Sequence, residues 1–334
     1  MSLASRLRHH LADTRPLQVD EFRRLWVSNI ITVIGAQLTV VSVPAQIWAI
    51  TQDSGYVGLT GVFGLVPLVI FGLWGGAMAD VHDRRAMLMV TTTGIIVTSL
   101  AFWVQAALGI NNVWLILTIF ALQQAFFGLN QPVRAAILPR LVPDELLPAA
   151  NSLNMTVFMF GGIAGPLVGG ALIPVLGFAW LYFIDAVTLL VTFWAVWKLP
   201  HLPPLGEPGS RAGFRSIVDG LAYLRGRTIL VMSFVVDLIA MIFGMPRGLF
   251  PQLANQNYGG PLTGGLALAV LFAAIPVGGL FGGIFSGWVS RVQHQGRAVV
   301  VSIGVWGLGV VGFGLASWWA GGTPWPWLAI GAFM

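Results

Sequence analysis

The chain contains no cysteine and few charged residues. Only 9% of its 334 residues are Asp, Glu, Lys or Arg. Without cysteine the chain can form no disulfide, no thiolate metal site and no cysteine nucleophile. Its five histidines, at positions 9, 10, 82, 201 and 294, are scattered through polar segments and do not form a metal-binding pattern. We therefore expect no metal, no other cofactor and no redox chemistry.

Apolar residues make up most of the chain instead. Hydrophobic residues account for 57% of the sequence, with 14 Trp and 21 Phe. A soluble core could not bury this much apolar surface, so the composition indicates an all-α, polytopic membrane protein. The formal net charge of +5 would favour nucleic acid in a soluble protein, but in a membrane protein excess arginine reflects insertion topology. We expect the lipid bilayer as a partner, and no nucleic acid.

Long apolar runs predict membrane-spanning helices. A bilayer core about 30 Å thick requires about 20 apolar residues in a helix. The first 24 residues are polar and basic, so they do not resemble a signal peptide. We predict nine complete spans, and a tenth that starts near residue 326, at 27–50, 57–79, 86–108, 113–130, 153–176, 178–197, 229–250, 264–286 and 298–320.

Basic residues lie almost entirely on one side of these spans. All but one of the 17 Lys and Arg residues precede the first span or follow the second, fourth, sixth or eighth, whereas Arg247 lies near the far end of the seventh. The positive-inside rule then predicts a cytoplasmic N-terminus in a multi-pass protein of the cell membrane. One missed span would place basic residues on both sides, so the same distribution supports the number of spans.

A polar stretch rich in proline and glycine, at 199–228, divides the spans into two groups. We predict a cytoplasmic N-terminal segment (1–26), a six-helix bundle (27–198), a cytoplasmic central loop (199–228) and a partial second bundle (229–334) with helices seven to nine and the start of ten. Two six-helix halves with a substrate cavity between them are a known transporter plan. The chain would then lack the last helices of that plan.

A cluster of charges follows the second span. Asp80, Asp83, Arg84 and Arg85 lie within six positions, shortly after Gly76. These charges must lie in water or pair with one another, because hydrocarbon penalises them, and the small residues before them allow helices to approach closely. We interpret the segment as a tight loop at a membrane face that takes part in a conformational change.

This loop resembles the signature of the major facilitator superfamily, Gly-x3-Asp-(Arg/Lys)-x-Gly-(Arg/Lys)-(Arg/Lys). The sequence departs from it at Val81, in place of a basic residue, and at Asp83, in place of a glycine. With Asp83 the loop resembles that of the branch that includes enterobactin exporters and macrolide-efflux proteins. Segments 42–47, 134–143 and 273–278 also resemble that branch. The signature positions that match are Gly76, Asp80, Arg84 and Arg85.

The resemblance implies a C-terminally truncated protein of the major facilitator fold, with a six-helix N-terminal bundle and an incomplete second bundle. It implies secondary active efflux of a small amphipathic, siderophore-like molecule by alternating access, with protons as the coupling ion and a monomer as the working unit. A multidrug or macrolide efflux pump, and a shortened member inactive alone, are the alternatives. An enzyme is disfavoured, since the outer loops carry almost no acids or histidines.

In the family the signature loop acts as a cytoplasmic latch. The resemblance therefore implies that Asp80 contacts a helix end in the other half of the protein. Arg84 and Arg85 would then hold the charge network of the loop, or serve only as topology anchors.

A glycine-rich segment in the fifth span resembles a motif associated with exporters, in which helix five slides against the other half. The alternative is ordinary small-residue packing. The motif residues are Gly161, Gly165, Pro166, Gly169 and Gly170.

Three charged residues lie within the predicted spans. An ionised carboxylate is costly in a membrane, so a carboxylate within a span is by default a candidate functional residue. Asp185 or Asp237 could carry the proton in antiport, or each could simply hydrogen-bond neighbouring helices. Arg247, near the outer mouth, could attract an anionic substrate.

Uncharged polar side chains in the first and fourth spans are further candidates for substrate contacts. Gln37 and Gln46 lie in the first span, where Asn29, Thr32 and Thr39 are also polar. Amide hydrogen bonds between packed helices would explain them equally well. In the fourth span, Gln123 and Gln124 occupy the region where the family usually has an arginine.

Overall fold

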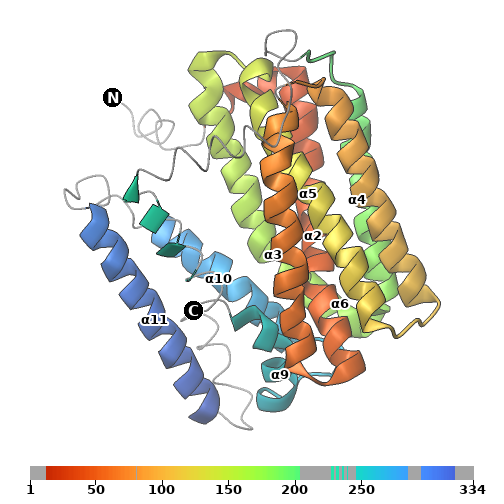
Figure 1. Ribbon diagram of the computed structural model, residues 1–334, viewed down its shortest axis with the longest axis vertical. Coiled ribbons are helices and arrows are strands. Elements are labelled where there is room, and N and C mark those ends of the chain that lie inside the picture. Colours follow the sequence, from red (N-terminus) through yellow and green to blue (C-terminus); the bar gives the residue numbers. More distant parts are fainter. Residues whose placement is uncertain are drawn as a thin grey trace, which may run out of the picture.

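The computed structural model describes residues 13–79, 81–203, 227–228, 231–232, 235–236, 239, 246–284 and 295–319. Within the first 203 residues the long helices pack into one bundle, preceded by the short helix η1 (Arg15–Gln18) and interrupted by η2 (Asp144–Leu146) (Figure 1). Asp80 and Asp237, most of the predicted central loop and most of the seventh predicted span lie outside the described residues. The helices of the bundle are α2 (Asp20–Thr51), α3 (Ser54–Ala79), α4 (Arg84–Ala107), α5 (Val113–Leu141) and α6 (Leu147–Trp197).

The path of α6 reverses at Gly177. This residue has φ 75° and ψ 168°, a conformation that only glycine adopts readily. Before the reversal, residues 161–169 pack against 33–38 of α2 in the same order; after it, residues 185–192 contact 32–39 in the opposite order. The two predicted spans on either side of residue 177 are therefore the two antiparallel halves of α6.

α5 extends beyond the predicted fourth span, to Leu141 rather than to residue 130. It continues through Pro132 and Pro139. Proline is tolerated inside membrane helices where neighbouring groups satisfy the freed backbone carbonyls. Most of segment 134–143, which the sequence places after the span, therefore belongs to the helix, and Arg134 lies within it.

A second group of helices packs beside this bundle, with α10 against α6. It consists of η3 (Pro246–Leu249), α9 (Phe250–Gln252), η4 (Leu253–Asn257), α10 (Leu266–Ile284) and α11 (Gln295–Trp319). The backbone N–H of Gly265 donates to the carbonyl of Gly170 in α6 (2.9 Å), and α11 lies further from the bundle than α10 (Figure 1). Among the described residues, seven helices are long and apolar enough to cross a membrane.

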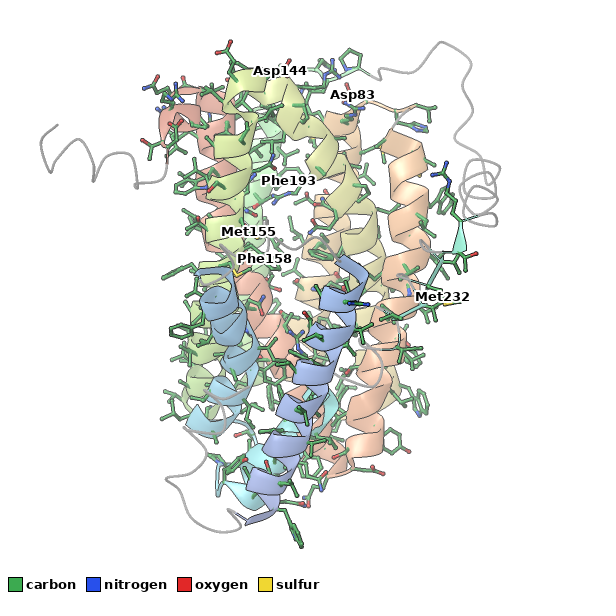
Figure 2. The ribbon with its side chains drawn as sticks, turned by 90° about the vertical axis from the view of Figure 1, so that its left-hand side faces the viewer. Asp83, Asp144, Met155, Phe158, Phe193 and Met232 are labelled. Carbon is green, nitrogen blue, oxygen red and sulfur yellow. The ribbon has the colours of Figure 1, made fainter. Side chains whose placement is uncertain are left out.

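The two ends of the bundle carry different groups. The end that holds the α3–α4 loop, the C-terminus of α5 and the start of α6 is called the Asp83 end; Figure 2 shows Asp83 and Asp144 there. The opposite end, called the Gly177 end, holds the reversal of α6 together with η3, α9 and η4. There the hydroxyl of Ser54 donates to Oε1 of Gln252, which joins α3 to α9.

Two adjacent glycines in the last turns of α3 provide a matched test of this packing. A Cβ on Gly75 would lie 2.8 Å from Leu129 Cα in α5, whereas a Cβ on Gly76 would meet nothing within 4 Å among the described residues. Gly75→Ala forces the two backbones apart, so we expect it to destabilise the protein by about 1–3 kcal/mol and to lower its thermal unfolding temperature in detergent. Gly76→Ala should not lower it, and equal losses in both variants would contradict this packing.

Candidate functional site

A cavity of about 640 Å³ lies among α2, α4, α5 and α6 and extends from the Asp83 end to the middle of the bundle. Its volume is typical of small-molecule sites, and its surface is mainly apolar. The charged residues of its lining are Arg134 and Asp185. Most of the remaining polar side chains of the lining are amides: Asn29, Gln37, Gln123, Gln124, Asn130, Gln131, Asn151 and Asn154.

An apolar cluster separates the deep end of this cavity from the Gly177 end. It joins Leu38 of α2 and Ile173 of α6 to Leu268 of α10, all buried. In the same cluster Phe250 of α9 packs edge-on against Phe272, with 5.2 Å between the ring centroids. The described residues therefore close the cavity on its Gly177 side, and this cluster is called the outer cluster below.

Asp185, in the second half of α6, lies at the deep end of the cavity and is only 1% exposed. Its Oδ2 accepts hydrogen bonds from Thr39 Oγ1 (2.7 Å) and Ser99 Oγ (3.0 Å). Gln123 Nε2 in turn donates to Ser99 Oγ (3.0 Å). Among the described residues, Asp185 Oδ1 has no hydrogen-bond partner. One carboxylate oxygen is therefore held by two hydroxyls, and the other is buried without a hydrogen-bond partner among the described residues.

Gln46 belongs to a separate network outside the cavity lining. Its amide pairs with that of Gln105, with Gln105 Nε2 donating to Gln46 Oε1 (3.0 Å) and Gln46 Nε2 donating to Gln105 Oε1 (3.3 Å). The hydroxyl of Tyr182 donates to the same Oε1 (2.9 Å), and its ring stacks on Phe102. These contacts link α2, α4 and α6, so they match the helix-packing alternative for Gln46.

The other candidates from the sequence divide between the cavity and the rest of the molecule. Arg247 lies on η3 and is absent from the cavity lining, and its neighbour Gly248 lies against Gly58 of α3. Asp237 lies outside the described residues. Four candidates come together in the one cavity: Gln37, Gln123, Gln124 and Asp185.

Arg134 is a cavity residue that the sequence-based prediction places outside the membrane span. Its Nη1 donates to Asn29 Oδ1 of α2 (2.7 Å), and both residues line the cavity. The spacing of polar and aromatic residues along α5 carries the signal, because positions three or four apart share one helix face. That face holds Gln123, Gln124, Phe127, Asn130, Gln131 and Arg134.

The glycines of the exporter-like motif use two faces of α6. Gly161, Gly165 and Gly169 lie against α2, within the bundle. Gly170 lies against α10, where an added Cβ would be 2.7 Å from the Cα of Ala269. The motif, including the buried Pro166, therefore allows close packing inside the bundle, and its Gly170 also allows α10 to approach α6 closely.

The α3–α4 loop is fastened to the segment that follows α6. Asp83 Oδ1 accepts from the backbone N–H of Ala86 (2.8 Å) and caps α4. Its Oδ2 accepts from the backbone N–H of Leu202 (3.2 Å) and lies 3.5 Å from Nδ1 of His201. Asp83 thus joins the start of α4 to the start of the segment that the sequence predicts as the central loop.

The two arginines of the loop bind backbone carbonyls within the bundle. Arg84 is 5% exposed, and it donates through Nε to the carbonyl of Ala79 (3.2 Å) and through Nη1 to that of Ala136 (3.2 Å). Arg85 Nη2 donates to the carbonyl of Trp197 (2.7 Å) at the end of α6. Both side chains therefore link helices at the Asp83 end.

Residues 25–334 match the model of a family described as the Major Facilitator Superfamily. The chain belongs to this family. It is 28% identical to the enterobactin exporter EntS of Shigella boydii serotype 18 and 27% identical to that of Escherichia coli O139:H28, across 89% of this chain and 73% of each relative. The predicted family and its exporter-like branch are confirmed by these matches.

The fold of this facilitator is also found in a solved structure. A D-xylose–proton symporter superposes with a TM-score of 0.58 at 12% sequence identity, covering 95% of this chain and 80% of the symporter. At that identity the likeness concerns the fold alone. The predicted all-α, polytopic major facilitator fold is therefore confirmed, and the protein is a multi-pass membrane transporter.

Asp83 provides a test of the loop through the pH dependence of stability. Partial burial raises the pKa of its carboxyl, but hydrogen bonds from the Ala86 N–H, His201 and the Leu202 N–H outweigh this, so the pKa lies below its usual value. A lowered folded-state pKa means that the stabilisation is complete above the unfolded-state pKa of about 3.9 and is lost as the pH falls below it.

We expect Asp83→Ala to destabilise the facilitator by about 1 kcal/mol at pH 7, as for loss of a helix cap, and by less at pH 3, where the carboxyl loses its charge. Asp83→Asn, which can still cap α4 but does not titrate, is the matched control and should be more stable than Asp83→Ala by the same amount at both pH values. The measurement is thermal unfolding in detergent. A loss in Asp83→Ala that is the same at both pH values would contradict this role of the carboxylate.

Proposed function

We propose that this facilitator exports a small amphipathic molecule by alternating access, in exchange for protons. The observation that carries the proposal is the cavity, which combines an apolar surface with many amides and a buried carboxylate, and which the outer cluster closes on one side. The names of the relatives, enterobactin exporters, support a siderophore-like substrate. We propose a monomer as the transporting unit, divided at residues 199–228 into two bundles.

We further propose that the Asp83 end faces the cytoplasm. Arg23, Arg24, Arg85 and Arg140 lie at this end of the bundle, as the positive-inside rule requires of a cytoplasmic face. Substrate then enters the cavity from the cytoplasm, and separation of the outer cluster releases it on the other side of the cell membrane. The loop from Gly76 to Arg85 is the gating element at the cytoplasmic end.

Asp185 is our candidate for the proton carrier. In its ionised form the carboxylate can accept a hydrogen bond from a donor group of a substrate at the deep end of the cavity, whereas a protonated carboxyl is a weaker acceptor. Protonation also removes a charge that the membrane interior disfavours. Proton and substrate therefore compete for Asp185, which is the requirement for antiport.

A pump of broad specificity, for drugs or macrolides, is the second candidate. Aromatic side chains in the lining favour it, because flat apolar surfaces accept many ligands: Phe22, Trp26, Phe127 and Phe158. Competition separates the two candidates. A siderophore exporter should transport a siderophore in the presence of excess macrolide, whereas a broad pump should be inhibited by it.

Transport in inside-out membrane vesicles tests the proposal. We expect an inside-acid pH gradient to drive uptake of a siderophore such as enterobactin, and an uncoupler to abolish it. Because the chain has no cysteine, the pair Ser54→Cys and Gln252→Cys can be crosslinked to lock the Gly177 end. Crosslinking should stop transport and reduction should restore it, while Ser54→Cys alone stays active. Full transport by the crosslinked protein would contradict alternating access through this end.

Asp185→Asn tests the proton carrier. Asparagine keeps the size of the side chain but cannot bind or release a proton near neutral pH. We expect gradient-driven uptake to fall at least tenfold, while exchange of labelled for unlabelled substrate without a gradient continues. Asp144→Asn, at an exposed position of η2, is the matched control and should retain both activities. Gradient-driven uptake unchanged in Asp185→Asn would exclude this role.

A further inference from the structure

Arg134 is a charged residue of the cavity that the proposed proton exchange does not use. It lies on α5, and within the described part of the chain its guanidinium makes one hydrogen bond, from Nη1 to Asn29 Oδ1 (2.7 Å). None of the ion pairs formed within the described part of the chain includes Arg134. A guanidinium has five N–H donors, so most of its donors are free to bind a ligand.

The carboxylate of Asp185 is too far away to neutralise Arg134. Asp185 is connected through Ser99 to Gln123, and Gln123 precedes Arg134 by eleven residues of α5, which is about 16 Å along a helix. Asp185 is also held in place by Thr39. The lining therefore contains one cation and one anion at separate depths.

An arginine that served only as a topology anchor would extend towards lipid headgroups. Arg134 instead contacts α2 from α5 and lines the cavity together with Asn29. Arg134 therefore belongs to the cavity wall rather than to a lipid-facing surface.

We propose that Arg134 is an anion subsite that binds a carboxylate, or a similar acidic group with paired oxygens, on the transported molecule. A planar guanidinium matches such a group with two parallel hydrogen bonds, and Asn29 holds it in position. Phe127, two turns earlier on the same face of α5, and Phe158 of α6, labelled in Figure 2, supply apolar surface for the rest of the molecule. The inference rests on the proposed export and narrows its substrate to amphipathic acids.

A matched pair of probes tests the subsite. Pyrenebutyrate and its carboxamide have the same apolar ring and differ in one acidic group. Binding to the purified protein in lipid nanodiscs is measured by energy transfer from tryptophan to pyrene, with empty nanodiscs subtracted. We expect the protein to bind the acid at least tenfold more tightly than the amide, and Arg134→Gln to bind both with the affinity of the amide.

Two further variants separate binding from folding. Asn29→Asp places a carboxylate beside the guanidinium without removing Arg134, so it should abolish the preference for the acid in a folded protein. Arg140→Gln is the control, because Arg140 donates to the carbonyl of Pro203 (2.5 Å) and does not line the cavity; it should keep the preference. Equal affinities for acid and amide in the unaltered protein, or an unchanged preference in Arg134→Gln, would overturn the subsite.

The same variants distinguish failure of the subsite from failure of export. If the protein prefers the acid through Arg134 but its vesicles accumulate neither probe nor siderophore, the subsite is supported and the proposed export is wrong. If the vesicles accumulate siderophore equally well with Arg134→Gln, and the acid is not preferred in binding, export is supported and the subsite is wrong.

Discussion

The cost of placing polar groups in hydrocarbon determines how the first bundle is arranged. Asp185 satisfies one carboxylate oxygen with hydroxyls from α2 and α4, and this single contact brings three helices to the same depth. Nearer the Gly177 end, Gln46, Gln105 and the Tyr182 hydroxyl likewise satisfy one another by hydrogen bonds and join the same three helices. Such groups must find partners inside the bundle, and Asp185 Oδ1 is one of the few buried polar atoms of the described residues that has none.

Close backbone contacts supply the second constraint. Gly75 allows α3 to approach α5, and the glycines of α6 allow it to pack against α2 on one face and α10 on another. Since apolar side chains gain little from leaving lipid for a protein interface, helix association in a membrane depends on such close packing. The contact of Gly170 with Ala269 therefore does more than fill space. It is one of the positions where the first bundle meets α10, next to the outer cluster that would have to separate during transport.

Much of this architecture could be predicted from the sequence. The apolar runs gave the spans of the first bundle, and the break at residue 177 coincides with the reversal of α6. The C-terminus of α5 and the position of Arg134 in the cavity wall were missed, because a criterion based on apolar runs stops where a helix becomes polar on its cavity face. Pro132 and Pro139 also predict that the helix ends early, but in the packed bundle α5 continues through both. Gln46 and Gln37 look alike in sequence, and only the packing places one in a buried pair and the other at the cavity. The assigned roles of the site residues remain predictions.

The attachment of residues 202 and 203 to the bundle has a mechanical consequence. Leu202 is held by Asp83 and Pro203 by Arg140, so the start of the predicted central loop is attached to the first bundle as far as Pro203. A displacement of the second half would therefore pull first on the N-terminus of α4 and the C-terminus of α5. Those two helices carry Ser99, Gln123 and Arg134. A pull on the predicted central loop would therefore act directly on helices that line the cavity.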